Sequence, residues 1–162
     1  MNPILIDLET TGLNITRARI VQIGIIYKNK DYNILINPEI DIPEDSSRIH
    51  GIKNEDVIGK STFKEISSTL LKMINECDCL IGYNIKSYDW NILFIEFLRC
   101  GIELPNKELI DVYLMIKDIE YSKKLKDVYA RLLGTKSVND HDALSDIKNT
   151  KSVYDFIIKK YY

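Results

Sequence analysis

Apolar residues along the chain fall into two patterns, short unbroken runs and helically spaced repeats. A short run rich in Ile, Leu and Val between turn residues predicts a buried strand, whereas apolar residues three or four positions apart predict one face of a helix. The runs predict strands at residues 3–9, 19–28, 32–37, 79–83 and 108–110. The repeats predict helices at residues 62–76, 86–100, 112–120, 124–133 and 142–160.

Turn and capping residues separate these elements. Residues 10–12 (Thr-Thr-Gly) predict a turn after the first strand, and residues 29–31 (Asn-Lys-Asp) predict a hairpin between the second and third strands. Pro38 and Pro43 indicate a loop that continues to residue 60. Three residues mark helix ends: Asp111 before a helix, and Gly101 and Gly134 after one. The order β-β-β-α-β-α-β-α-α-α indicates an α/β chain, an antiparallel meander followed by parallel strands.

Length and composition fit one folded domain. A chain of 162 residues is long enough to bury a substantial core, so we expect a single domain over residues 1–162. Hydrophobic residues make up 45% and charged residues 28%, which excludes a disordered or collagen-like chain. No run approaches the roughly 20 apolar residues that a membrane helix needs, so we expect no membrane partner.

Charge and cysteine content restrict the partners and the compartment. The chain has 22 Lys and Arg against 24 Asp and Glu, a net charge of −2. This balance does not indicate nucleic acid directly, but bound divalent cations would add positive charge that the sequence does not count. The three cysteines, Cys77, Cys79 and Cys100, form no disulfide framework, and the first residues lack a signal-peptide pattern. We therefore expect reduced thiols and a cytoplasmic location.

The first predicted strand ends in two carboxylates, Asp7 and Glu9. Side chains two residues apart on a strand point to the same face, so the two lie side by side, opposite Ile6 and Leu8. Like charges on a core strand are unfavourable unless a cation lies between them, and hard divalent cations prefer carboxylate oxygens. A solvated strand end is the alternative explanation for this pair taken alone.

Two further features are ambiguous when taken singly. Asp89 lies near the start of a predicted helix, where a carboxylate also complements the helix dipole. Asp142 and Asp146 lie four residues apart and therefore share one face of the last helix. His141 precedes that helix, where it can reach over the same face or lie on a surface loop.

Together these segments resemble the DEDDh family of 3′→5′ exonucleases. Residues 7–13 (DLETTGL) match the first family motif nearly letter for letter, residues 82–89 (GYNIKSYD) match the second, and residues 141–146 (HDALSD) match the third. Residues 49–52 (IHGI) match a further signature. The motifs occur in the family's order along the whole chain. They are most similar to those of the proofreading epsilon branch of bacterial DNA polymerase III. The sister subfamily has Tyr where this chain has Asp142, so the histidine subfamily is indicated.

The resemblance implies both a fold and a reaction. The fold is ribonuclease-H-like, with a five-stranded mixed sheet flanked by helices. The reaction is metal-dependent removal of 5′-mononucleotides from the 3′ end of DNA, with two Mg²⁺ ions for which Mn²⁺ can substitute. The implied metal ligands are Asp7, Glu9, Asp89 and Asp146, with His141 as the general base. The implied substrate contacts are Thr10, Thr11, Gly12, Leu13, His50 and Asn84.

The sequence leaves the roles of four further residues open. Lys123, Lys124 and Lys126 either follow a phosphate backbone or form a solvated face. Gln22 stands where many relatives carry an acid, and we do not expect it to bind metal.

Several functions also stay open. The expected partner is a single-stranded or frayed 3′ end, with a DNA polymerase as a second possible partner. An RNA-directed exoribonuclease of the same family is an alternative. A catalytically silent nucleic-acid-binding accessory domain is another, although such a domain would be expected to lack a ligand. An endonuclease of the ribonuclease H type shares the acids but gives no reason for the segment around His141.

Overall fold

Five strands form one mixed sheet in the computed structural model, which describes residues 1–118, 122–137 and 141–161. The strands are β1 (Ile4–Thr10), β2 (Ile20–Tyr27), β3 (Lys30–Leu35), β4 (Cys79–Gly82) and β5 (Glu108–Asp111). Their order across the sheet is β3-β2-β1-β4-β5. β1, β2 and β3 form an antiparallel meander, while β4 pairs in parallel with both β1 and β5. The expected five-stranded mixed sheet is confirmed.

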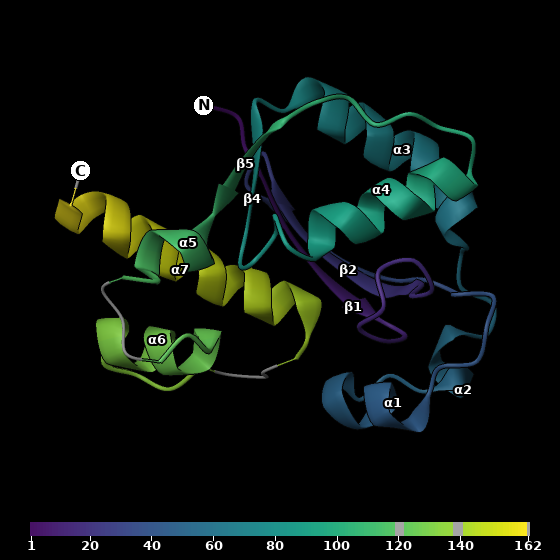
Figure 1. Cartoon of the computed structure of the whole chain (residues 1–162), viewed down its shortest axis with the longest axis horizontal. Coiled ribbons are helices and arrows are strands. Elements are labelled where there is room, and N and C mark those ends of the chain that lie inside the picture. The colour runs from purple at the N-terminus through teal and green to yellow at the C-terminus, as the bar shows by residue number, and fades with distance from the viewer. Residues whose placement is uncertain (119–121, 138–140, 162) are drawn as a thin grey trace.

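Helices cover both faces of the sheet (Figure 1). The core residues of α3 (Phe63–Glu76) and α4 (Asp89–Arg99) pack on one face, and those of α5 (Val112–Ile116), α6 (Leu125–Leu133) and α7 (Ala143–Tyr161) pack on the other. Two short helices, α1 (Glu44–His50) and α2 (Asn54–Val57), lie beside one end of the sheet. None of the described helices is long and apolar enough to cross a membrane.

β1 is buried on both faces because its alternate residues enter different cores. Ile4, Ile6 and Leu8 pack against α3 and α4, whereas Leu5 packs against the helices of the opposite face. Asp7 and Glu9 continue the row of Leu5, as the alternation predicts. They lie at the end of the strand where apolar cover is incomplete, and both are only partly buried.

The hairpin between β2 and β3 is tighter than expected. Its turn is formed by Lys28 and Asn29, whose φ angles of 50° and 60° are left-handed. Lys30 already pairs with Tyr27, so β3 begins two residues earlier than the sequence predicts. A two-residue turn with both φ angles positive matches the natural twist of paired strands, which explains the shift.

One predicted loop and two predicted helices also differ from the structure. The expected loop after Pro38 contains α1 and α2, which are too short to give a clear helical repeat. α4 begins at Asp89 rather than at residue 86, because Ser87 N and Tyr88 N both donate to Asn84 O and form a tight turn. α5 ends at Ile116, and residues 119–120 of the predicted helix lie outside the described residues.

Candidate active site

Asp89 joins the carboxylates of β1 through a backbone contact. β1 pairs with β4 only as far as Leu5, so the edge of β1 beyond that residue is free of a strand partner. Asp89 Oδ1 accepts a hydrogen bond from Leu8 N at 3.1 Å and occupies this edge. Asp89 is 5% exposed and is the first residue of α4, so the helix start holds its carboxylate beside Asp7 and Glu9.

His141 and Asp146 reach the same region from the N-terminal end of α7. His141 has a left-handed φ of 66°, and its N–H donates to Asp146 Oδ2 at 3.0 Å. This bond folds the residue before the helix back over the first turn. As a result, the possible ligand atoms of Glu9, His141 and Asp146 all lie within 4.8 Å of one another.

The electrostatics of this cluster are dominated by burial and by like charge. Burial, followed by the charges of Asp89, Glu9 and Asp146, raises the pKa of Asp7 well above its usual value. Burial and the charge of Asp146 raise the pKa of Glu9 to about 8, and burial raises the pKa of Asp89 to about 7. These carboxylates therefore resist ionisation, because the protein alone does not compensate the negative charge that they would carry together.

A divalent cation fits this donor set. Carboxylate oxygens are the ligands that Mg²⁺ prefers, and ligand atoms around one ion lie about 4 Å apart or less across it. The group of Glu9, His141 and Asp146 is close to this spacing, and its excess negative charge would be neutralised by bound cations. The geometry thus allows His141 to act either as a ligand or as a base.

A second constellation lies beside the carboxylates, at the end of β1. His50, the last residue of α1, accepts a hydrogen bond from Ile52 N at Nδ1, 3.1 Å away. Its Nε2 therefore carries the proton and donates to Thr10 O at 3.2 Å. Burial lowers the pKa of His50, which favours this neutral form.

Tyr88 completes the wall of a small cavity next to Glu9. Its hydroxyl lies 2.6 Å from Thr10 Oγ1 and donates to Gly12 O at 2.7 Å. The cavity has a volume of about 120 Å³, and Leu13 and Ile49 also line it. These two residues are 86% and 56% exposed, respectively. The cavity therefore offers polar groups at its base and apolar groups at its mouth.

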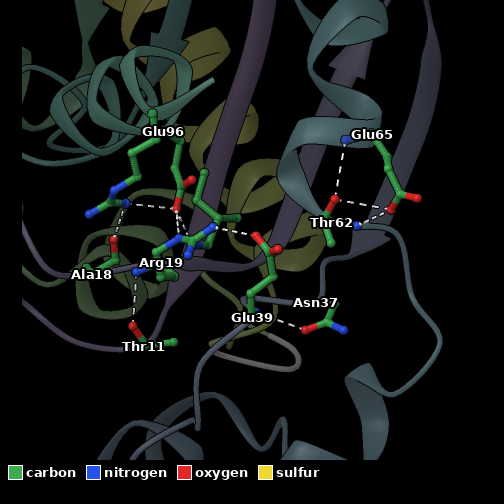
Figure 2. A network of polar contacts seen from close by, with 10 residues as sticks. Thr11, Ala18, Arg19, Asn37, Glu39, Thr62, Glu65 and Glu96 are labelled. Atoms are coloured by element: carbon green, nitrogen blue, oxygen red, sulfur yellow. Dashed lines mark hydrogen bonds and ion pairs between the residues drawn. The ribbon is translucent and has the colours of Figure 1, made fainter. Parts of the chain in front are cut away.

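An ion-pair network around the buried Glu96 fastens the β1–β2 connection to α4, and Figure 2 shows its contacts with Arg19 and Ala18. Glu96 is 1% exposed, and its Oε1 accepts from Arg19 Nε at 2.8 Å and from Arg99 Nη1 at 3.1 Å. Arg99 also donates to Ala18 O at 3.0 Å. The network closes the end of the β1–β2 connection against the helix that carries Asp89.

Thr11 stabilises the turn through two hydrogen bonds with the backbone of Arg19. Its N–H donates to Arg19 O at 2.9 Å, and its Oγ1 accepts from Arg19 N at 3.0 Å. Both groups therefore hold the turn closed, and the hydroxyl keeps its own O–H as a donor. The Gly12 N–H has only a 3.5 Å contact with Thr10 Oγ1, so it is the less engaged amide of the turn.

Comparison with known proteins places this geometry in a family. The family model described as Exonuclease (RNase T type) matches residues 4–154, nearly the full chain. The chain belongs to this exonuclease family. The expected membership is confirmed, and the matched region includes every metal-ligand candidate named above.

Individual relatives of this exonuclease-family chain carry related names. It is 38% identical to DNA polymerase III subunit epsilon of Rickettsia prowazekii over 130 residues, covering 74% of the chain and 56% of that protein. It is 29% identical to exonuclease DPD1 of Arabidopsis thaliana over 171 residues, covering 91% of the chain and 53% of that protein. It is 27% identical to 3′-5′ exonuclease DinG of Staphylococcus epidermidis, covering 69% of the chain and 13% of that protein. The chain spans little more than half of these relatives at most.

Solved structures agree on the fold. Escherichia coli exonuclease I in complex with a dT13 oligonucleotide superposes with a TM-score of 0.84 over 98% of the chain, at 16% identity and 41% coverage of that protein. Another exonuclease I structure, determined to explain processivity, gives a TM-score of 0.86. The ribonuclease-H-like fold implied by the motifs is confirmed.

Asn84 differs from the other expected contacts of this exonuclease-family site. Its φ is left-handed at 62°, and its N–H donates to Asp111 Oδ1 at 2.9 Å. Asp111 is 4% exposed, also accepts from Lys86 N at 3.2 Å, and caps α5 by accepting from Tyr113 N at 3.1 Å. The sequence alone indicated only the capping role of Asp111. The contact of Asp111 with the turn before Asp89 depends on the parallel pairing of β4 with β5.

Two lysines lie near the N-terminal end of α7. Lys124 and Lys126, at the start of α6, line a cavity of about 370 Å³ together with His141 and Asp146. The structure thus brings two of the three undecided lysines to the carboxylate cluster. Positive charge at this position suits an anionic ligand that approaches Asp146.

Proposed function

We propose that the chain is a metal-dependent 3′→5′ exonuclease that releases 5′-mononucleotides from the 3′ end of DNA. The observation that carries the proposal is the convergence of Asp7, Glu9, Asp89 and Asp146 with His141 in a chain of the exonuclease family. Two Mg²⁺ ions would bring four positive charges to four carboxylates, which leaves the site able to accept a phosphodiester anion. Mn²⁺ is expected to substitute.

Each residue has a role in this proposal. Bound cations would polarise the scissile phosphate and lower the pKa of water. Asp7, Glu9, Asp89 and Asp146 would hold the cations, and His141 would accept the proton of the attacking water in its neutral form. His141 is exposed and precedes α7, so solvent can remove that proton afterwards.

The substrate contacts follow from the small cavity beside Glu9. The terminal nucleotide would occupy it, with the Gly12 amide and the Thr10 and His50 region at its base, and Leu13 against the last base. Thr11 would hold the turn in place, and Asn84 would contribute through the β4–α4 turn. Lys124 and Lys126 would attract the phosphate backbone toward Asp146.

The partners and compartment are part of the same proposal. A single-stranded or frayed 3′ end is supported by the oligonucleotide bound to the structural neighbour exonuclease I. A DNA polymerase partner is supported by the relative named DNA polymerase III subunit epsilon. The three free cysteines, two of them buried, fit a reducing compartment such as the cytoplasm.

The test is digestion of end-labelled single-stranded DNA, duplex DNA and RNA with Mg²⁺ or Mn²⁺. We expect a ladder of products from a free 3′ end and none from a 3′-blocked strand, whereas a 5′ block should have no effect. Equal digestion of 3′-blocked and free strands refutes the polarity, cleavage of a circular strand indicates an endonuclease, and preferential RNA digestion supports the exoribonuclease alternative.

Asp7→Ala is the matched inactive variant. We expect orders of magnitude less cleavage with an intact or more stable fold, because removing one carboxylate from a like-charged cluster relieves repulsion. Near-normal cleavage by Asp7→Ala would refute the proposed metal site. Absence of cleavage by the unmodified chain would favour a silent nucleic-acid-binding domain.

A further inference from the structure

We propose that Gln22 is a positioning residue for the catalytic end of α7; this rests on the proposed function. Gln22 lies on β2 opposite Glu9 in the sheet register and is 6% exposed. Its Oε1 accepts from Ala143 N at 3.0 Å, and its Nε2 donates to Asp142 Oδ1 at 3.0 Å. One buried amide therefore holds two consecutive residues at the start of the helix.

Asp142 connects Gln22 to the proposed catalytic residues through further hydrogen bonds. Its Oδ2 accepts from Ser145 N at 3.0 Å and Ser145 Oγ at 2.9 Å, which caps the first turn. Its backbone carbonyl accepts from Asp146 N at 2.8 Å. His141 is the preceding residue and donates to Asp146. A shift of Asp142 would consequently move both His141 and the carboxylate of Asp146.

Gly24 shows that α7 rests directly on β2 at this point. A Cβ atom on Gly24 would lie 2.3 Å from the carbonyl carbon of Ala143 and 2.5 Å from Leu144 N. No side chain separates the helix backbone from the strand here. The Ala143 N–H is one of the first helical amides, which lack a partner within the helix, and the side-chain Oε1 of Gln22 is its hydrogen-bond partner.

The polarity of both bonds requires an amide at position 22. A Gln side chain offers one acceptor and two donors, whereas a carboxylate only accepts. Glu could still accept from Ala143 N, but it would place a second negative charge against Asp142. Leu would fill the space and make neither bond. Exchanging the two groups, by Gln22→Glu together with Asp142→Asn, restores a donor facing an acceptor between positions 22 and 142 and leaves the net charge unchanged. The exchange gives up the weaker bond, at 3.2 Å, that Asn33 Nδ2 donates to Asp142 Oδ1.

The experiment uses the full chain and three measurements. They are calorimetric Mn²⁺ affinity, hydrogen exchange of the Ala143 amide by NMR, and kcat and KM on a 5′-labelled single-stranded DNA. Gln22→Leu and Gln22→Glu should each lower Mn²⁺ affinity and kcat about 10- to 100-fold, the usual effect of losing a group that orients a metal ligand. KM should stay constant, because His50 and Tyr88 hold the terminal-nucleotide cavity independently of α7. Exchange of the Ala143 amide should accelerate in Gln22→Leu.

Rescue and a core control separate positioning from general stability. The double variant Gln22→Glu/Asp142→Asn should recover most of the kcat and Mn²⁺ affinity that Gln22→Glu loses. Ile74→Val removes one methyl group from a fully buried core position on α3 and should lower Tm without changing kcat. Asp142→Asn alone preserves an oxygen for the Ser145 cap. It should therefore lower kcat and Mn²⁺ affinity less than Gln22→Leu does.

Two results would overturn the proposal. One is a Gln22→Leu variant that matches Ile74→Val in kcat, Mn²⁺ affinity and Ala143 exchange. The other is a double variant no better than Gln22→Glu. If the unmodified chain cleaves no nucleic acid, the proposed function fails separately, and Mn²⁺ affinity and amide exchange still decide the role of Gln22.

Discussion

The stability of the cation-free protein should fall as pH rises, because its carboxylates hold protons that the unfolded chain releases. The pKa of Glu9 rises from 4.5 to about 8 and that of Asp89 from 3.8 to about 7. A group with a raised folded-state pKa stabilises the fold fully below its unfolded pKa and loses that contribution as pH passes the folded one. The loss for this pair therefore falls between about pH 4 and pH 8.

The magnitude follows from proton linkage. Between about pH 5 and pH 8, Glu9 alone accounts for roughly 3 kcal/mol of unfolding free energy. Asp89 adds less unfolding free energy than its own pKa shift would give alone, because its charge already contributes to the raised pKa of Glu9. A total of about 3–5 kcal/mol is a large part of the 5–15 kcal/mol typical of a domain, and it corresponds to about 10 °C in Tm.

His50 acts in the opposite direction over part of this range. Burial lowers its pKa, so the unfolded chain binds the extra proton and stability rises with pH up to the unfolded pKa of 6.5. Above about pH 7 His50 is neutral in both states. The interval from about pH 7 to pH 8 therefore isolates the effect of the carboxylates.

Thermal unfolding followed by circular dichroism measures this effect, in EDTA and in excess Mg²⁺. Without cations Tm should fall toward pH 8, and Mg²⁺ should raise it most at that pH because cation binding requires ionised carboxylates. Glu9→Gln should flatten the slope, whereas Glu103→Gln, an exposed substitution in the α4–β5 connection, should not. A cation-free Tm that is constant or rising between pH 7 and pH 8, or an equal Mg²⁺ effect at pH 5 and pH 8, would refute the reasoning.

Two substitutions test the catalytic end of α7. His141→Ala should lower kcat about 10²- to 10⁴-fold, while calorimetric Mn²⁺ affinity is retained. A large loss of Mn²⁺ affinity would make His141 a ligand instead of the base. Gly24→Ala should cost about 1–3 kcal/mol of unfolding free energy and most of the activity, because its Cβ would overlap the backbone of Ala143 and displace the helix. A normal Tm and rate in Gly24→Ala would show that α7 does not rest on β2 as described.

The local chemistry of the chain was readable from its sequence. Alternation along β1 placed Asp7 and Glu9 on one face because strand side chains repeat every two residues. Asp111 and Gly134 marked helix ends because capping depends on a few neighbouring atoms, and the structure places a cap at each. The motif resemblance carried the family and the fold, since the three motifs occur in order along one chain.

The supports of the site were decided only by tertiary structure. Gln22 and Asp142 lie 120 residues apart, and their hydrogen bond depends on α7 lying across β2. Asp89 completes the cluster because β4 ends before covering the far edge of β1, and no local pattern reports where a neighbouring strand stops. Thr11 was predicted from the sequence as a substrate contact, and the structure adds that its N–H donates to Arg19 O and its hydroxyl accepts from Arg19 N across the β1–β2 connection. The sequence specifies which groups can bind a ligand or donate a hydrogen bond, whereas tertiary packing decides which partners lie within hydrogen-bond distance of them.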